Sequence, residues 1–201
     1  MDKARIAVLV SGGGTNLQAL LDAQTKGILK SGQICLVISN NPNAYALERA
    51  KNAGVESKVV TKKEVGSQNA FEQKIIDLLE EKQIDIIVLA GFMSILSENF
   101  TSQYPERILN VHPSLIPSFC GAGFYGLKVH EAALAKGVKV TGATVHLVNE
   151  IPDGGRILLQ KAVDILPEDT AETLQRRVME QAEWILLPRA TELLCKQITE
   201  E

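Results

Sequence analysis

Short apolar runs alternate with amphipathic helical segments through the first half of the chain, and this alternation limits the possible folds most strongly. The runs that predict strands are residues 5–10, 34–39, 57–60, 84–92 and 107–111. The segments with helical spacing between them are residues 15–27, 44–54 and 68–81. Strand–helix units of this length predict an α/β fold, with a mostly parallel twisted sheet and helices on both faces.

The second half has a different pattern. Residues 140–148 and 156–165 predict two strands joined by a turn that contains Pro152-Asp153-Gly154-Gly155, so one edge of the sheet is expected to be antiparallel. Residues 170–195 predict a long helix that Pro188 bends or interrupts. Because no linker or repeat divides the 201 residues, we expect a single domain, 1–201.

Composition excludes several classes of protein. The net charge of −3 gives no reason to expect a nucleic-acid partner, and no apolar segment is long enough to span a membrane. The three cysteines form neither a metal-ligand spacing nor a disulfide framework, so we expect no metal and a cytoplasmic location. The sequence leaves a monomer and a homodimer equally open.

The glycine-rich stretch SGGGTN, residues 11–16, follows the first predicted strand and opens the first helix. Backbone N–H groups at such a turn attract phosphate, which makes Gly13, Gly14, Thr15 and Asn16 candidates for an anion site. The stretch matches neither a P-loop nor a dinucleotide fingerprint. A tight turn with a Thr or Asn helix cap is the alternative.

The stretch ILNVHPSLIPSF, residues 108–119, places Asn110 and His112 two residues apart at the end of an apolar strand. Their side chains therefore share one face. An amide donates to a developing oxyanion and an imidazole transfers protons near neutral pH, so the pair is a candidate catalytic site. Alternatively, both side chains satisfy backbone groups at the strand end.

Four further polar residues have either a structural or a functional interpretation. Asp153 either forms a hairpin turn or stabilises a protonated imidazole. We expect His146 to be structural, His130 to lie on a helix surface, and His112 alone to be catalytic. Glu183 is explained adequately as a solvated helix residue without reference to relatives.

Six sequence blocks in order resemble the folate-dependent formyltransferase family, in its glycinamide ribonucleotide branch. They cover nearly the whole chain, and they are VLVSGGGTNLQAL, SNNPNAYALERAKNAG, VLAGFMSILS, ILNVHPSLIPSF, TGATVHLVNEIPDGGRILLQ and AEWILLP. The resemblance implies a Rossmann-like formyltransferase fold. It also implies transfer of the formyl group of 10-formyltetrahydrofolate to the amine of glycinamide ribonucleotide, in purine synthesis and without a metal.

The same resemblance implies roles for particular residues. Asn110 and His112 would stabilise the tetrahedral oxyanion, with His112 as the acid and Asp153 keeping it protonated, directly or through water. The ribonucleotide would be bound by Gly13, Gly14, Thr15, Asn16 and Glu183. The folate would be bound by Gln68, Met93, Ser94, Ile95, Leu96, Asn110, Asn149, Glu150 and Asp153. Ser94 and Gln68 stand where basic residues are common in the family, which lowers the expected affinity for the glutamate tail of the folate.

Three other functions compete with this one. A formyltetrahydrofolate deformylase uses the same chemistry with water as the acceptor, but it has an additional domain before the first strand. A methionyl-tRNA formyltransferase has an additional C-terminal domain. A non-catalytic α/β module that holds a phosphorylated metabolite would explain SGGGTN, but it leaves Asn110, His112 and Asp153 without a role.

Overall fold

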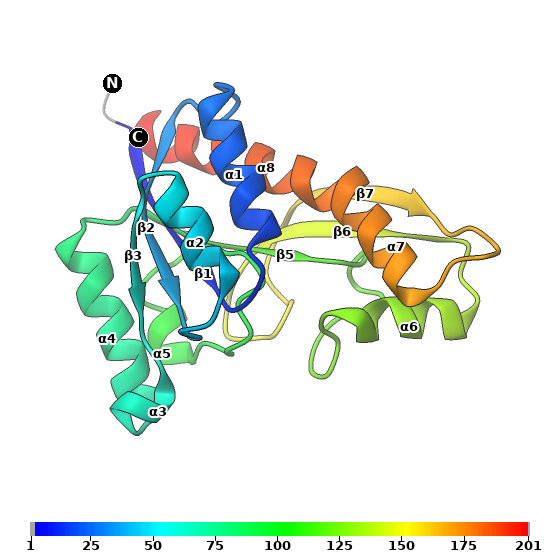
Figure 1. Ribbon diagram of the computed structural model, residues 1–201, viewed down its shortest axis with the longest axis horizontal. Coiled ribbons are helices and arrows are strands. Elements are labelled where there is room, and N and C mark those ends of the chain that lie inside the picture. The colour runs from blue at the N-terminus through cyan, green and yellow to red at the C-terminus, as the bar shows by residue number, and fades with distance from the viewer. Residues whose placement is uncertain (1–2, 201) are drawn as a thin grey trace.

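The computed structural model describes residues 3–200, which form one seven-stranded sheet with helices on both faces (Figure 1). The strands are β1 Ala4–Val10, β2 Gly32–Ser39, β3 Glu56–Val59, β4 Ile86–Leu89, β5 Ile108–His112, β6 Val140–Leu147 and β7 Ile157–Asp164. The helices are α1 Thr15–Thr25, α2 Tyr45–Asn52, α3 Lys62–Val65, α4 Gln68–Glu81, α5 Glu98–Thr101, α6 Leu127–Lys136, α7 Ala171–Val178, the π-helix η1 Met179–Glu183 and α8 Trp184–Glu200.

The strand order is β3-β2-β1-β4-β5-β6-β7. β1 to β5 pair in parallel, whereas β6 runs antiparallel to both β5 and β7. This confirms the predicted mostly parallel sheet with an antiparallel edge. The order reverses between β1 and β4, and in open α/β sheets ligands bind beyond the carboxyl ends of strands at such a point.

Alternate residues of the buried strands face two separate cores. In β1, Ile6 and Val8 pack in the core under α1, α2, α7 and α8, whereas Ala7 and Leu9 pack against α4 and α5 on the opposite face. Because both faces of β1 are covered, every second position has to be apolar on each side. This explains why the strand reads as one continuous apolar run.

Two predicted elements differ from the structure. The strand expected over residues 84–92 covers only Ile86–Leu89, and the chain then leaves the sheet toward its carboxyl edge. The C-terminal helix contains a π-helical segment, Met179–Glu183, and continues through Pro188 to Glu200. The irregularity therefore lies one turn before the proline. A π-helix accommodates one additional residue per turn, and such segments are frequent at functional sites.

None of the helices in the described part of the chain combines the length and apolar character that a membrane span needs.

Candidate active site

The turn SGGGTN lies at the carboxyl end of β1, where Gly14 is the N-cap of α1. Gly14 has φ +71°, and a Cβ on it would lie 2.6 Å from Cβ of Ala46. The turn therefore requires glycine here, because only glycine combines a positive φ with this close approach of α2. Arg49, also on α2, donates from Nε to the carbonyl oxygen of Gly13 over 2.8 Å and so holds the turn against this helix.

Asn16 and Glu183 form a buried pair at the start of α1. Asn16 Nδ2 donates to Glu183 Oε2 over 2.7 Å, and the two side chains are almost fully buried. Burial raises the pKa of Glu183 to about 7, although the hydrogen bond from Asn16 opposes this shift. Asn16 Oδ1 is buried without a partner in residues 3–200. Glu183 is therefore not a solvated helix residue.

Asn110 and His112 end β5 side by side, as their spacing predicted. β6 pairs with β5 so that His146 lies opposite Asn110, and Asn110 Nδ2 is 3.2 Å from His146 Nε2. His146 Nδ1 is 2.8 Å from the carbonyl oxygen of Leu147, so the ring donates from Nδ1. The expectation of a purely structural His146 did not anticipate this contact with the candidate catalytic amide.

Asp153 connects the two histidines. Its carboxylate oxygens lie 3.5 Å from His112 Nδ1 and 3.5 Å from His146 Nε2. Oδ2 also accepts a hydrogen bond of 2.8 Å from the backbone N–H of Gly121. Burial by itself raises the pKa of Asp153, but the hydrogen bonds from His146 and Gly121 and the charges of both histidines outweigh it and lower the pKa. The carboxylate therefore stays ionised beside both rings.

His112 is nearly buried, and its Nε2 is 2.8 Å from the carbonyl oxygen of Phe119. A carbonyl only accepts, so Nε2 carries the proton in this contact. Phe119 has φ +50° and begins the glycine-rich segment 119–126, whose residues 121–126 line the same cavity as His112. This segment therefore determines which nitrogen of His112 is free to face a substrate.

The predicted folate segment, residues 93–96, follows β4. Met93 N donates to Ser11 Oγ, and Ser94 Oγ accepts from Asn40 Nδ2, each over 2.8 Å. Met93 and Ile95 are exposed, at 57% and 71% of their surfaces, whereas Leu96 is buried. Residues 93–95 therefore lie at the surface, and Leu96 anchors the segment to the core.

A buried carboxylate holds this segment in place. Glu72 on α4 accepts hydrogen bonds from the N–H and the hydroxyl of Ser97 and from Nε2 of Gln68. Gln68 Nε2 also donates to the carbonyl oxygen of Ile95 over 3.2 Å. Gln68 thus supports the loop from behind, and it does not line the cleft.

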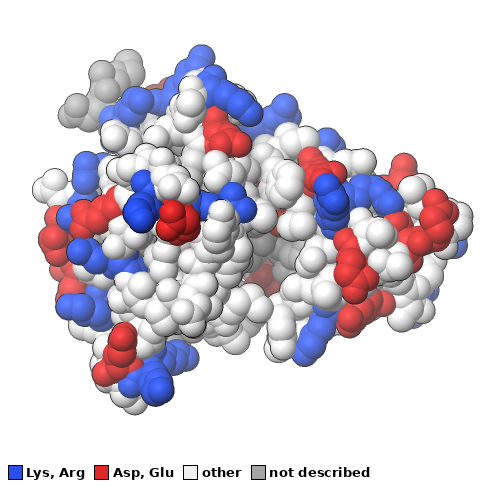
Figure 2. Space-filling model, in the orientation of Figure 1, with Lys and Arg blue, Asp and Glu red and all other residues white. Residues whose placement is uncertain are grey.

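A cleft of about 650 Å³ opens at the carboxyl ends of β1, β4 and β5. Figure 2 shows a hollow in this face of the molecule between the part with α2 and the part with α6 and α7. The predicted site residues that line the cleft are Asn16, Met93, Ser94, Ile95, Asn110, His112, Asp153 and Glu183. Among the lining residues that the sequence did not indicate are four large side chains, Phe124, Tyr125, Gln175 and Met179.

Other predicted residues lie elsewhere. Asn149 and Glu150 line a different depression, beside Arg156, and Thr15 borders a cavity between α1 and α8. His130 is completely buried on α6, so the prediction of a helix-surface residue is wrong. Burial, together with the charge of His112, lowers the pKa of His130 to about 4. Its position followed from the packing of α6, which the local sequence did not reveal.

In residues 3–200, no three His, Cys, Asp or Glu side chains are grouped in a way that would hold a metal ion.

Comparisons with known proteins agree with this arrangement. The chain matches the formyl transferase family model over residues 4–191. It is 43% identical over 177 residues to a phosphoribosylglycinamide formyltransferase of Haemophilus influenzae, covering 88% of this chain and 81% of the relative. It is 46% identical over 192 residues to the human trifunctional purine biosynthetic protein adenosine-3, covering 96% of this chain but only 18% of that relative.

Solved structures show the same fold. Glycinamide ribonucleotide transformylase 1 from Symbiobacterium toebii superposes with a TM-score of 0.91 at 40% identity, covering 97% of this chain and 89% of that one. A formyltetrahydrofolate deformylase from Pseudomonas syringae superposes with a TM-score of 0.86 at 27% identity, covering 98% of this chain and 62% of that one. From the family match, its extent and these likenesses, we conclude that the chain belongs to the formyl transferase family.

Proposed function

We propose that this protein transfers the formyl group of 10-formyltetrahydrofolate to the amine of glycinamide ribonucleotide, as a phosphoribosylglycinamide formyltransferase in purine synthesis. The observation that carries the proposal is the cluster of Asn110, His112 and Asp153 at the wall of a cleft of about 650 Å³. The names of the Haemophilus influenzae relative and of the Symbiobacterium toebii structure support this substrate pair.

In this proposal, the amine of the ribonucleotide attacks the formyl carbon, and the C=O electron pair becomes an oxyanion. Asn110 Nδ2 and the protonated His112 donate to that oxyanion, which is the role of fixed donors in acyl transfer. The carbon–nitrogen bond to folate then breaks. The leaving nitrogen takes a proton from His112, and the attacking amine gives up one, so the charges balance.

Asp153 places its negative charge 3.5 Å from His112 Nδ1, beside the ring that donates the proton. His146 has a supporting role, because it contacts both Asn110 and Asp153 and so fixes the amide next to the carboxylate. His112 Nε2 becomes available to the substrate when its contact with the carbonyl of Phe119 opens.

The two substrates would bind in different places, the ribonucleotide near the start of α1 and the folate near residues 93–95. The N–H groups around Gly13, Gly14 and Thr15 would hold the ribonucleotide phosphate at the start of α1. Asn16 and Glu183 would contact its sugar or amine end. Residues 93–95 would bind the edge of the pterin ring, with Ser94 where a basic side chain is common and Gln68 supporting the segment from outside the cleft.

The deformylase is the second candidate, because a member of that class shares the fold at 27% identity. It requires only that water replaces the amine in the same cleft. Within the transferase proposal, the chain acts as a single domain, 1–201, as a monomer or homodimer. The three cysteines are unpaired, which fits the reducing cytoplasm.

Formyl transfer to glycinamide ribonucleotide, measured with purified protein, tests the proposal. We expect ribonucleotide-dependent turnover, and His112→Ala and Asp153→Asn should each lower kcat by a factor on the order of 10² to 10⁴. Gln73→Ala, at an exposed position of α4, is the control. Formate released at a comparable rate without the ribonucleotide would establish the deformylase instead. Binding of the ribonucleotide without formyl transfer would instead support a non-catalytic binding module.

A further inference from the structure

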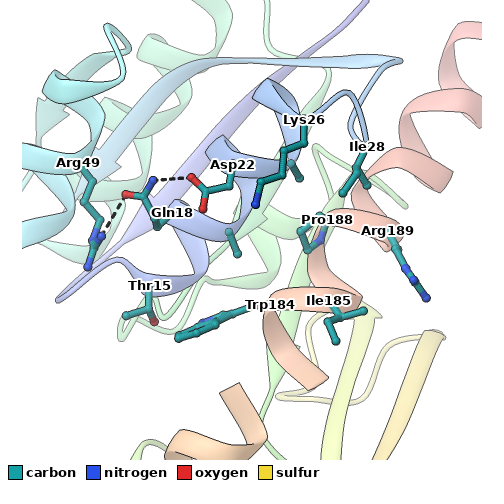
Figure 3. Close-up of a pocket in the computed structure, with 12 residues that line it drawn as sticks. Thr15, Gln18, Asp22, Lys26, Ile28, Arg49, Trp184, Ile185, Pro188 and Arg189 are labelled. Carbon is teal, nitrogen blue, oxygen red and sulfur yellow. Dashed lines mark hydrogen bonds between the residues drawn. The ribbon is translucent and has the colours of Figure 1, made fainter. Parts of the chain in front are cut away.

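A second cavity, of about 490 Å³, lies between α1 and α8 and shares no lining residue with the cleft (Figure 3). The α8 wall is formed by Trp184, Ile185 and Pro188. On α1, the small side chains of Ala19 and Ala23 leave the space open. The cavity is thus a wide apolar slot, and its size is typical of small-molecule sites.

Cations surround this slot. Lys26, Arg49 and Arg189 line it, against the single carboxylate of Asp22. In residues 3–200, none of these three cations lies within 4.0 Å of a carboxylate oxygen. Three unpaired cations at one cavity, in a chain with a net charge of −3, favour an anionic ligand.

The cations lie at two ends of the cavity. Figure 3 shows Lys26 and Arg189 on either side of Ile28 at one end, with the Arg189 side chain pointing away from Lys26, and Arg49 beyond Gln18 at the other end. Arg49 is already engaged, since it donates to the Gly13 carbonyl and to Gln18 Oε1 over 2.8 and 3.0 Å. Lys26 and Arg189 are therefore the free anion-binding groups.

A polar strip runs along α1 between these two ends. Gln18 accepts from Arg49 and donates to Asp22 Oδ1 over 2.8 Å (Figure 3). Asp22 Oδ2 has no hydrogen-bond partner within the described chain. It is a free acceptor on the α1 side of the cavity, suited to an amino or hydroxyl group on a bound ligand.

We propose that this cavity binds a nucleoside monophosphate. Lys26 binds the phosphate and the exposed side chain of Arg189 turns toward it on binding, because ammonium and guanidinium groups bind phosphate oxygens by charge-assisted hydrogen bonds. The heterocycle packs against Trp184 and Ile185, where a flat ring gains apolar contact and stacking. Asp22 Oδ2 accepts from a ribose hydroxyl or an exocyclic amine.

Fluorescence provides a direct test, because Trp184 is the single tryptophan of the chain. Titration of the intact protein with adenosine monophosphate should change the emission saturably, and calorimetry should give the same affinity. Lys26→Ala/Arg189→Ala should weaken binding by about tenfold or more. Adenosine alone and inorganic phosphate alone should each bind more weakly than the nucleotide.

The matched control is Lys63→Ala/Lys136→Ala, which removes two exposed cations from α3 and α6, away from the cavity, and should leave the affinity unchanged. Equal affinity in the Lys26/Arg189 variant overturns the proposal, as does the absence of binding in both fluorescence and calorimetry. Displacement of the nucleotide by excess glycinamide ribonucleotide would place the nucleotide at the proposed ribonucleotide site and would also overturn the proposal.

Discussion

Asn16 donates to Glu183 over 2.7 Å, a contact that joins the first turn of α1 to the end of the π-helix, 167 residues later in the chain. The pair closes one end of the cleft. The carboxyl of Glu183 is 6% exposed, and burial raises its pKa to about 7. Its charge therefore changes within the neutral range, in contact with the region proposed for the ribonucleotide.

Glu183→Gln should change the pH dependence of stability. In the wild type, the folded pKa of about 7 lies above the ordinary glutamate value of 4.5, so the folded state holds a proton that the unfolded state releases. This contribution to stability is complete below pH 4.5 and is lost as the pH rises through 7. The loss is at most about 3 kcal/mol.

The glutamine variant should lack this decline, because it does not ionise, and its amide can donate to the unpaired Asn16 Oδ1. Urea unfolding at pH 5, 6, 7 and 8 measures the effect. Glu180→Gln, at an exposed position of the same π-helix, is the control. An unchanged decline in the Glu183 variant would assign the pH dependence to another group.

His130→Leu should make the protein more resistant to acid. Burial lowers the pKa of His130 to about 4 in the folded state, against 6.5 as its ordinary value, so the unfolded state binds the proton first. The wild type should lose stability as the pH falls from 6.5 to 4, by at most about 3 kcal/mol.

Neither ring nitrogen of His130 has a partner within the described chain, so the apolar replacement should also add about 1 kcal/mol at pH 7. Thermal unfolding from pH 4 to 8 measures both effects, with Glu131→Gln as the exposed neighbouring control. If the leucine variant is less stable than wild type at pH 5, the ring has an interaction that the structure does not show.

Glu72→Ala should impair folate binding more than chemistry. The carboxylate is buried and holds Ser97 and Gln68, which position residues 93–96. Its removal leaves buried donors without a partner, and we expect a loss of about 3 kcal/mol in stability. In steady-state kinetics, KM for the folate should rise by about tenfold, with a smaller change in kcat. Equal effects of Glu72→Ala and the exposed Gln73→Ala would contradict this role.

Gly14→Ala should destabilise the phosphate turn, whereas Gly12→Ala should not. A Cβ at Gly14 meets Ala46 at 2.6 Å with φ +71°, but a Cβ at Gly12 meets no atom within 4 Å. We expect a loss of about 3 kcal/mol for Gly14→Ala and less than about 0.5 kcal/mol for Gly12→Ala, measured by urea unfolding. Similar losses of unfolding free energy in the two variants would contradict the explanation by positive φ and contact with Ala46.

Much of the fold is visible in the sequence, because the residues that form a strand or helix are neighbours in the chain. The spacing of Phe71, Ile75 and Leu78 predicted a helix over 68–81, and α4 covers these residues. The two-residue spacing of Asn110 and His112 placed both at the strand end. The π-helix was missed, since one additional residue in a helical turn leaves the apolar spacing nearly intact.

The sequence by itself determined the alternation of strands and helices, the antiparallel edge, and the presence of an amide and an imidazole at the end of β5. Only the tertiary structure decided which polar residues meet. The β5–β6 register places His146 against Asn110, and the packing of η1 on α1 buries Glu183 against Asn16. These contacts depend on how elements far apart in the chain pack together. The local spacing of residues therefore does not indicate which partner a buried polar side chain will contact.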